Sequence, residues 1–283
     1  MLRHSISTHK YLLIILVFCF SASMSSCSDN VTLNSPNGLV VIFKADDLGD
    51  TTANWNRFMK IVIDNNICAG VGVIPGRVTT EGSKSEIRRI HELKRWSKFP
   101  FIEFWNHGYD HSKINGITEF SGSDTNAQIN HIELSQNFLL YNLNSTCHTF
   151  GAPFNRTSGV TSSALINFPE INVWLCYQNN EKHFLSEWKD PNKKVINQTD
   201  RHIILNTDYL YLNDFPIGNI INNYERDKDK PYVLIQIHPA KWDDSKFVQF
   251  EKLIHFYKDR HLATFMTPYQ YFKYLHKEYT LSE

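Results

Sequence analysis

Short apolar segments alternate with amphipathic helical patterns along most of the chain. Residues 39–43 form an uninterrupted apolar run rich in β-branched side chains, which is typical of a strand buried on both faces. Residues 55–63 then place apolar side chains at i, i+3, i+4, i+7 and i+8, the spacing of one helical face. The same alternation predicts strands at 68–74, 101–105, 147–150, 171–176, 203–205, 233–237 and 263–266, and helices at 84–97, 125–141, 247–257 and 269–275.

Repeated strand–helix units indicate an α/β protein whose strands run parallel, because consecutive parallel strands need a crossover between them. About seven strands over residues 39–283 suit a distorted parallel (β/α) barrel. No linker and no internal repeat interrupts this region, so residues 39–283 are expected to form one domain. Residues 28–38 are mostly polar, contain Pro36, and are expected to act as a tether.

The first 27 residues have the pattern of an export signal. Arg3, His4 and Lys10 lie before or beside a short apolar run at 11–20, which is too short to span a bilayer. Small residues then lead to Cys27, in a segment that resembles a bacterial lipobox, where the Cys receives a lipid. The mature protein is therefore expected outside the cytoplasm, as a bacterial lipoprotein in the periplasm or at the cell surface. Plain secretion and an uncleaved anchor are the alternatives.

Composition narrows the partners and the redox chemistry of the chain. The 29 Lys and Arg residues balance 29 Asp and Glu residues, so no basic field exists to attract nucleic acid, and contact with a membrane is expected only through a lipid on Cys27. Cys68, Cys147 and Cys176 each lie in an apolar, strand-like run, and no CxxC pair occurs. They are expected to be small buried residues, with a disulfide between two of them as the alternative.

Polar clusters follow four of the predicted strands. Asp46 and Asp47 follow the first strand, His107 and His111 follow the third, residues 151–153 follow the fourth, and His238 follows the strand at 233–237. The carboxyl ends of parallel strands share one face of a barrel, and active sites assemble at that face. These four segments, which are far apart in the chain, are therefore expected to converge.

The converging residues offer the donors of a metal site. Two imidazoles and a carboxylate, from His107, His111 and Asp47, can hold one divalent ion, for which zinc is expected, and leave a position open. The i, i+4 spacing of the two His residues would place both rings on the same side of a helical turn. Such an ion acidifies a water and polarises a carbonyl, so that Asp46 can act as general base and His238 as general acid. Each pattern alone has a simpler interpretation, because HxxxH arises by chance in a chain with 13 His residues.

Taken in order, these segments resemble the motifs of the polysaccharide deacetylases, a group of carbohydrate esterases. The sequence KADDLG at 44–49 resembles the family's T-F-D-D-G, and HGYDH at 107–111 resembles its H-S/T-x-x-H. GAPF at 151–154 resembles R-x-P-Y/F, and IQIH at 235–238 resembles the motif in which a His follows a strand. The resemblance covers residues 39–275 and implies a distorted (β/α) barrel that holds a divalent metal ion.

The resemblance also implies a role for each matched residue. Asp47, His107 and His111 would be the metal ligands. Asp46 would be the general base, and His238 would be the general acid. The backbone N–H of Phe154 would help to bind the oxyanion, while Pro153 and Trp242 are expected to contact the substrate. The implied reaction is metal-dependent hydrolysis of an N- or O-linked acetyl group on a carbohydrate outside the cytoplasm. Trp105 and Trp188 are further candidates for stacking on a sugar, with core packing as the competing interpretation.

The chain departs from the family at two motifs. Gly151 stands where the family has the Arg that orients the catalytic Asp, and either Arg156 or Lys44 could take its place. The family's fourth motif, an Asp followed by a Trp, is not evident, although Trp174 could supply its hydrophobic part and Asp208 could be the partner of His238.

These departures keep two other functions open. One is a non-catalytic carbohydrate-binding lipoprotein on the same fold, and the other is a metal hydrolase of a different amide or ester. The sugar, its linkage and the preference for N- or O-acetyl groups are left open by the sequence, as are the physiological metal and the oligomeric state.

Overall fold

The structure is a computed structural model. It describes residues 38–79, 84–122, 124–177, 186–208, 211, 214, 216–260 and 262–277. The described residues all lie in one compact unit, Leu33–Glu283. The expected signal, its Cys27 and all of the tether except residue 38 lie outside the described residues. Within the described part of the chain, no helix has both the length and the apolar character that crossing a membrane requires.

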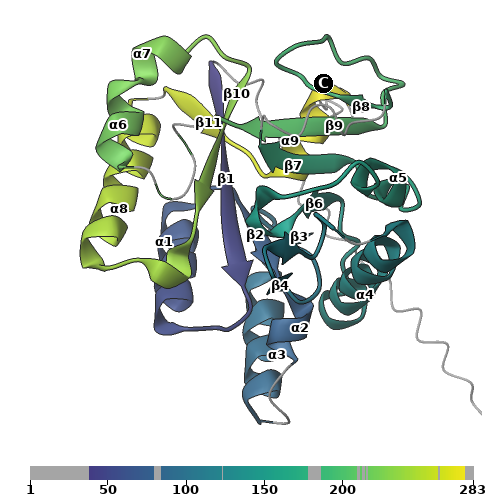
Figure 1. The fold of residues 1–283 in the computed structure, drawn as a ribbon. Coiled ribbons are helices and arrows are strands. Elements are labelled where there is room, and N and C mark those ends of the chain that lie inside the picture. The colour runs from purple at the N-terminus through teal and green to yellow at the C-terminus, as the bar shows by residue number, and fades with distance from the viewer. Residues whose placement is uncertain are drawn as a thin grey trace, which may run out of the picture. The chain divides into compact units, whose positions relative to one another are not determined.

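A parallel sheet forms the centre of the fold (Figure 1). Its strands lie in the order β10-β1-β2-β3-β6-β7-β9-β8, and β11 also pairs with β1. Every ladder of this sheet is parallel, which confirms the predicted α/β class. The described residues place nine strands in it: β1 (Leu39–Leu48), β2 (Ala69–Val73), β3 (Ile102–Asn106), β6 (Thr149–Gly151), β7 (Val173–Tyr177), β8 (Trp188–Lys189), β9 (His202–Thr207), β10 (Tyr232–Ile237) and β11 (Ala263–Phe265).

Helices pack around the outside of this sheet (Figure 1). They are α1 (Ala53–Asn65), α2 (Pro75–Val78), α3 (Lys84–Trp96), α4 (Thr125–Leu143), α5 (Thr161–Leu165), α6 (Ile217–Asn222), α7 (Tyr224–Asp227), α8 (Asp244–Asp259) and α9 (Pro268–Leu275). Single 3-10 turns follow two strands, η1 (Pro153–Asn155) after β6 and η4 (Pro239–Lys241) after β10. A short antiparallel hairpin, β4 (Lys113–Ile114) and β5 (Ile117–Thr118), extends from the loop after β3.

Strand β1 is central because its sequence is apolar on both faces. Its first five residues are almost completely buried, and the strand pairs with β2 on one side and with β10 and β11 on the other. Burial on both faces is what a continuous apolar run predicts for a parallel strand covered by helices. The helices α1 and α8 bury Phe58 and Phe250 against the β1 side chain of Phe43, whose ring centroid lies 5.1 Å from that of Phe250.

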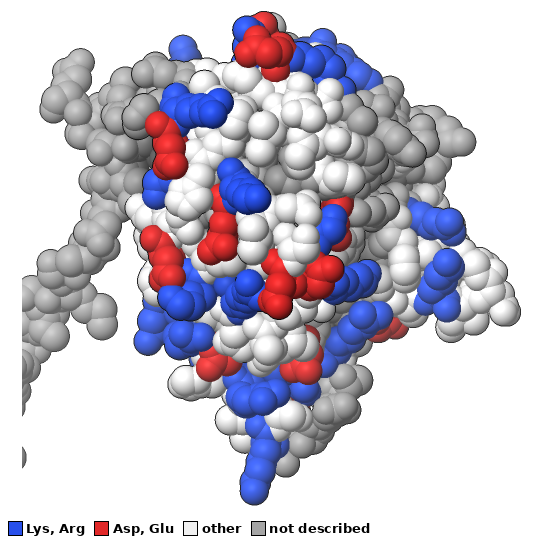
Figure 2. Space-filling view, turned by 90° about the vertical axis from the view of Figure 1, so that its left-hand side faces the viewer, with Lys and Arg blue, Asp and Glu red and all other residues white. Residues whose placement is uncertain are grey.

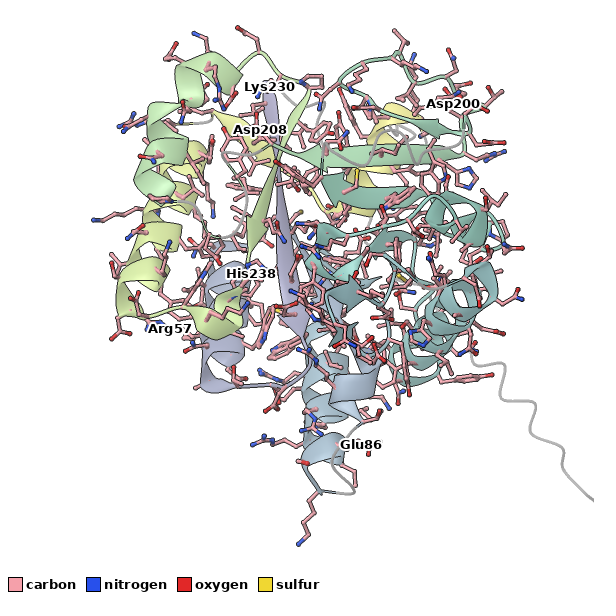
Figure 3. The ribbon with its side chains drawn as sticks, in the orientation of Figure 1. Arg57, Glu86, Asp200, Asp208, Lys230 and His238 are labelled. Carbon is pink, nitrogen blue, oxygen red and sulfur yellow. The ribbon has the colours of Figure 1, made fainter. Side chains whose placement is uncertain are left out.

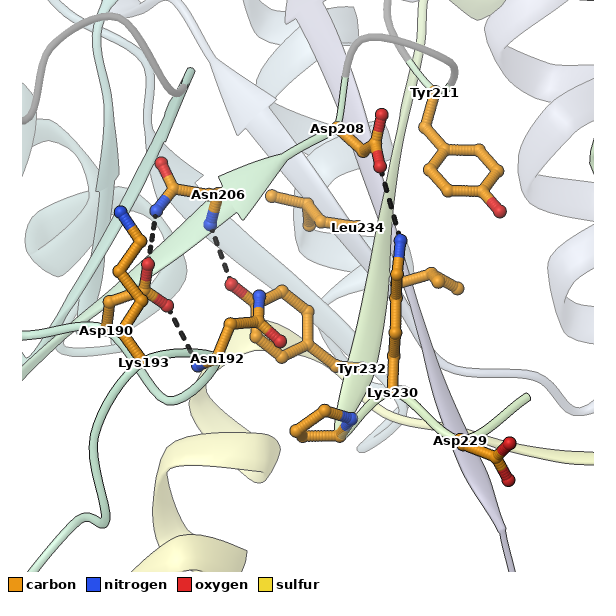
Figure 4. A pocket seen from close by; sticks show the side chains of 12 residues that line it. Asp190, Asn192, Lys193, Asn206, Asp208, Tyr211, Asp229, Lys230, Tyr232 and Leu234 are labelled. Carbon is orange, nitrogen blue, oxygen red and sulfur yellow. Dashed lines mark hydrogen bonds and ion pairs between the residues drawn. The ribbon is translucent and has the colours of Figure 1, made fainter. Parts of the chain in front are cut away.

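The barrel is irregular because it opens between β9 and β10. No ladder joins these two strands in the described chain, and a bond from the Asn206 N–H to the Tyr232 hydroxyl, 2.8 Å long, bridges them instead. A cavity of about 520 Å³ lies along this opening (Figure 4). The three Cys residues of the described chain are buried and free, so the expected burial is confirmed and no disulfide joins them: Cys68, Cys147 and Cys176.

Candidate active site

The two successive carboxylates Asp46 and Asp47 both line one cleft at the end of β1. In a regular strand, neighbouring side chains point to opposite faces. Here the register between β1 and β2 shifts between Ala45 and Leu48, and Asp47 takes a left-handed backbone conformation with φ 70°. Such a bulge redirects a side chain at the rim of a sheet, so that both carboxylates reach the same cleft.

The two His residues after β3 meet Asp47, as the sequence predicted. The Nε2 atom of His111 lies 2.9 Å from the Asp47 Oδ1 atom, and the Nε2 atom of His107 lies 3.2 Å from the same oxygen. The predicted helical turn between the two His residues is wrong, because residues 107–111 form a loop. Gly108 and His111 are both left-handed, with φ 72° and 56°, and this reversal of the chain brings the rings together instead.

A buried carboxylate that the sequence analysis missed holds this loop. The side chain of Glu119 accepts the N–H groups of Tyr109 at 2.5 Å and of His111 at 2.9 Å, and its Oε1 atom also lies 2.9 Å from the His131 Nδ1 atom. A Cβ atom on Gly108 would lie 2.6 Å from Glu119 Oε2, so only glycine fits there. Asp110, Glu119 and His131 also lie close enough to hold a metal, but Glu119 is already engaged by two backbone amides.

The arrangement of donors around Asp47 fits a divalent cation. His107 Nδ1 lies 2.7 Å from the Gly151 carbonyl, which can only accept, so this nitrogen carries the proton. In the neutral ring the Nε2 lone pair then faces the Asp47 carboxylate, and two acceptors 3.2 Å apart need a cation or a proton between them. The Arg77 guanidinium lies 3.3 Å from His111 Nδ1 and donates to the backbone carbonyl of His111 at 3.4 Å, so it contacts the side of the ring away from Asp47.

Asp47 is held as an anion. Burial opposes its ionisation, but the two adjacent imidazoles, His107 and His111, keep the pKa of Asp47 well below its ordinary value, as a cation in the same place would. The three donor atoms lie within 4.8 Å of one another. The set of two imidazoles and one carboxylate is the one that catalytic zinc and similar ions use when a coordination position stays open.

Asp46 lies beside this set in a buried network. Its Oδ2 atom accepts from Lys44 Nζ and, at 2.6 Å, from Gln236 Nε2. Its Oδ1 atom is buried and has no hydrogen-bond partner among the described residues. Asn155 closes the network, because its Oδ1 lies 3.3 Å from Lys44 Nζ and its Nδ2 donates to Gln236 Oε1 at 2.9 Å.

The pairing of β1 with β10 builds this network. Lys44 lies opposite Gln236 in the parallel register, Asp46 follows two residues later on β1, and His238 comes directly after the end of β10. Residues two apart in a strand share a face, so Lys44, Asp46 and Gln236 belong to the same side of the sheet. Lys44 and Gln236 could therefore have been identified from the sequence, because each lies two residues before a candidate functional residue, Asp46 or His238.

Of the two residues expected to substitute for an Arg at position 151, Lys44 is the one that contacts Asp46, while Trp105 fills the space beside Gly151. A Cβ atom on Gly151 would lie 2.8 Å from Trp105 Cζ3, and one on Gly72 would lie 2.5 Å from Trp105 Cη2. The two glycines therefore make room for a fully buried indole, over which Lys44 Nζ lies at 5.4 Å from the ring centroid. Of the two expected substitutes, Arg156 instead donates to the Gly116 carbonyl at 3.3 Å and is exposed.

His238 is held by Asp214, and the sequence-based choice of Asp208 is wrong. Asp214 accepts from the His238 N–H at 2.8 Å, and its other oxygen lies 3.0 Å from His238 Nδ1. Asp208 lies 3.2 Å from Lys230, and Figure 3 places both near the end of β10 opposite to His238. Burial opposes charge on His238, but Asp214 and the nearby Asp46 and Asp47 raise its pKa above the ordinary value.

Several residues expected at the substrate lie behind the cleft. Trp242 is only 5% exposed and donates through Nε1 to Asp214 Oδ1 at 2.7 Å, so it supports the partner of His238. Trp105, Trp174 and Trp188 are buried in the two hydrophobic clusters. Pro153 is buried as well, and neither it nor Trp242 lines the cleft.

Phe154 is the matched residue that does reach the cleft surface. Its side chain is 41% exposed, and its ring centroid lies 4.2 Å from that of His111. Its backbone is left-handed with φ 60°, a costly conformation for a large side chain that is found at functional sites. The cleft has a volume of about 310 Å³ and is lined by Asp46, Asp47, His107, His111, Lys113, Phe154, Asn155, Arg156, Gln236, His238 and Lys241.

Comparison with known proteins places the fold. No protein-family model matches the chain, and no curated protein gives a significant match. Among solved structures, the chain is similar to a family 4 acetyl xylan esterase from Clostridium thermocellum in complex with a cobalt ion, with a TM-score of 0.53 and 14% identity over 83% of this chain and 90% of that chain.

Two further structures are similar over the same extent. For the Xyl-CE4 domain of a multidomain xylanase from the hindgut metagenome of Trinervitermes trinervoides, the TM-score is 0.52 and the identity 13%, over 84% of this chain and 91% of that chain. For the peptidoglycan deacetylase PdaC from Bacillus subtilis, the TM-score is 0.52 and the identity 11%, over 86% and 94%. The structural neighbours are thus carbohydrate esterase family 4 proteins, which confirms the predicted deacetylase-type fold.

Proposed function

We propose that the protein is a metal-dependent hydrolase that removes an N- or O-linked acetyl group from a carbohydrate outside the cytoplasm. One observation carries the proposal. The unpaired Oδ1 atom of Asp46 belongs to a carboxylate that adjoins three convergent metal donors and lines the same cleft as His238. A base, a metal site and an acid in one cleft are the groups that hydrolysis of an acetyl amide or ester requires.

Asp47, His107 and His111 are the residues that would hold the ion, for which zinc is proposed. A divalent ion supplies polarisation of the acetyl carbonyl and acidification of the attacking water. The two His ligands are held in place by other groups of the protein. The Gly151 carbonyl fixes the tautomer of His107, and Glu119 fixes the loop that carries His111. Groups that fix the ligands of a metal in this way sustain both its affinity and its activity.

Asp46 is proposed as the general base. Its Oδ2 atom is already bound by Lys44 and Gln236, so Oδ1 is the oxygen that remains to take a proton from the attacking water. Lys44 and Gln236 are positioning residues for this step, because they hold the carboxylate in one orientation from the same face of β1 and β10. Lys44 also places a positive charge beside the buried carboxylate.

His238 is proposed as the general acid. The hydrogen bond from Nδ1 to Asp214 and the raised pKa favour the imidazolium form, which leaves a proton on Nε2 to donate to the leaving amine or hydroxyl group. The backbone N–H of Phe154 is proposed to help bind the oxyanion, since the left-handed turn at this residue lies against His111 at the edge of the cleft.

Cys27 is proposed as the site of a lipid anchor in an exported bacterial lipoprotein, on the strength of the lipobox-like segment. Mass spectrometry of the mature N-terminus from cells grown with and without globomycin tests this separately. An unmodified Cys27 would refute the anchor and leave the catalytic proposal unaffected.

Release of acetate tests the catalytic proposal. The zinc-loaded wild-type protein is expected to release acetate from at least one member of a panel of N- and O-acetylated oligosaccharides, and Asp46→Asn should reduce kcat by about 10²–10⁴-fold, the usual contribution of a general base. Metal content must stay unchanged in the variant. Equal acetate release by the two proteins would refute the role of Asp46, and hydrolysis of non-carbohydrate amides or esters alone would assign the site to another substrate.

A non-catalytic carbohydrate-binding role is the second candidate. It explains the loss of the family Arg at Gly151, but it gives no reason for a buried Asp46 that Lys44 and Gln236 orient beside a metal donor set. Binding of oligosaccharides without acetate release from any of them would favour this role.

A further inference from the structure

The rim of the candidate active-site cleft is basic. Three cationic side chains line it, Lys113 from β4, Arg156 after η1 and Lys241 at the end of η4, and all three residues are exposed. We propose that the substrate is an acidic glycan, whose carboxylate or sulfate groups bind these three cations while the acetyl group reaches the metal donors. The proposal rests on the deacetylase function given above and specifies its substrate class.

Two of the three rim cations, Lys113 and Arg156, have no carboxylate partner among the described residues. The acidic side chains that line the cleft are Asp46 and Asp47, which are committed to Lys44 and to the two His ligands. Lys241 Nζ lies 3.5 Å from Asp47 Oδ2, and a bound metal ion would bind the same carboxylate. The rim cations are thus available to an anionic ligand.

The face formed by α6, α7 and α8 does not share this basicity. The formal net charge of the chain is zero. On the face formed by α6, α7 and α8, basic and acidic side chains alternate (Figure 2). There Lys228 pairs with Glu225 at 2.6 Å. A cationic rim on a neutral protein concentrates the positive potential at the mouth of the cleft, where it attracts an anionic substrate.

The cleft offers little surface for stacking of a neutral sugar. Phe154 is the aromatic residue among its described lining residues, and Lys113 Nζ lies 5.6 Å from the centroid of that ring. Trp105, Trp188 and Trp242 are buried and cannot contact a sugar. Recognition therefore depends on polar and charged groups, and the Arg156 fork is suited to paired hydrogen bonds with a carboxylate or sulfate.

The three cations come from three different segments that line the cleft. Arg156 follows the turn that carries Phe154, Lys113 lies two residues after His111, and Lys241 lies three residues after His238. An acidic glycan with anionic groups on neighbouring sugars can thus contact more than one cation at once. Such spacing selects a polyanionic chain over a single charged monosaccharide.

A matched pair of substrates tests the proposal. An acetylated oligouronate and the same oligosaccharide after reduction of its carboxyl groups differ only in charge, and an acetylated, sulfated neutral oligosaccharide tests the other anion. We expect kcat/KM to be about tenfold or more higher for the acidic member of the pair, within the range by which charged clefts concentrate substrates. The preference should shrink as salt rises from about 0.01 M to about 0.15 M, because the screening length falls from about 30 Å to about 8 Å.

Removal of the rim charges provides the second arm. In Lys113→Gln/Arg156→Gln/Lys241→Gln, the ratio of kcat/KM for the acidic and reduced substrates should fall to near one, mainly through KM. Lys252→Gln is the matched control, since this exposed Lys on α8 lies outside the cleft and should keep the wild-type ratio.

Binding to the Asp46→Asn protein separates this proposal from the proposed function. If no substrate releases acetate but calorimetry shows that the acidic oligosaccharide binds through the three cations, the catalytic proposal fails and the binding preference stands. If the reduced substrate is hydrolysed as well as the acidic one, and the triple variant behaves like wild type, the acidic-glycan proposal is overturned while the deacetylase stands. Absence of binding by either oligosaccharide would also overturn it.

Discussion

The two main cavities of the molecule differ in how their polar groups are paired. The larger one, about 520 Å³, lies in the opening between β9 and β10; two of its carboxylates are paired with neighbours and the third, Asp229, is exposed to solvent (Figure 4). There Asp190 accepts from Asn206 and from the Asn192 N–H, both at 2.9 Å, and Asp208 pairs with Lys230. The smaller one, about 310 Å³, holds the unpaired Asp46 Oδ1 atom.

Of the two cavities, the smaller one therefore holds the buried carboxylate oxygen that lacks a partner, and the proposed function places the chemistry there rather than in the larger volume. Buried polar groups are almost always paired, so an exception calls for a ligand, a cation or a chemical role. In the smaller cleft Asp46 Oδ1 has no partner, and His107 Nε2 and Asp47 Oδ1 face each other as two acceptors. In the larger cavity Asp190 and Asp208 are paired and Asp229 is exposed to solvent, so none of the carboxylates described there is both buried and unpaired.

The largest effect is expected from loss of a metal ligand. His107→Ala should reduce bound divalent metal from about one ion per chain to almost none, because three protein donors are needed to hold the ion. Asp190→Asn, in the larger cavity, should retain the ion. Elemental analysis of the two proteins after equilibration with zinc measures this directly. An equal zinc content in both proteins would remove His107 from the ligand set.

The next largest effect is expected from Lys44→Met, which leaves the volume similar and removes the charge beside Asp46. Unfolding free energy should fall by about 3–5 kcal/mol, because the partner of a buried ion pair is left unpaired. In the protein that still folds, kcat should fall about 10–100-fold with little change in KM, as expected for a residue that positions a catalytic group.

Two comparisons keep the Lys44 prediction falsifiable. Lys44→Arg retains the charge and should recover part of kcat if the contact with Asp46 is what counts. Lys60→Met breaks the exposed pair with Asp64 and should alter neither quantity appreciably. A wild-type kcat in folded Lys44→Met would show that Asp46 needs no cationic partner.

A smaller effect, confined to alkaline pH, is expected from Asp214→Asn. His238 acts in its protonated form, and Asp214 helps to raise the pKa of His238, so activity in the wild type persists to a higher pH than an ordinary His would allow. Without the carboxylate the pKa of His238 falls, and the alkaline limb of kcat/KM should move to lower pH. A pH–rate profile with an unmoved alkaline limb would exclude His238 as the acid.

Much of the fold could be predicted because it depends on local patterns. The apolar run at 39–43 and the helical spacing at 55–63 are properties of short segments, and they correspond to β1 and α1. The convergence of Asp47, His107 and His111 also followed from sequence, since it requires only that parallel strands end at a common face.

The wrong predictions concern contacts between different segments of the chain, which local sequence patterns do not specify. The HxxxH segment is a loop because Glu119, eight residues after His111, binds its amides. Asp208 and Asp214 both follow the same predicted strand, and the local sequence does not show which of the two carboxylates contacts His238. Lys44 was one of two candidates for the role of the missing Arg, and the choice depends on Trp105, which fills the space at Gly151.

The account is tested most directly by measuring acetate release from Asp46→Asn and Asp190→Asn side by side, at equal zinc content and on the same acetylated oligosaccharides. Each variant replaces a buried or partly buried carboxylate by its neutral isostere, one in each cavity. The account predicts that Asp46→Asn loses about 10²–10⁴-fold in kcat while Asp190→Asn stays near wild type. A loss confined to Asp190→Asn, or no loss in Asp46→Asn, would contradict it.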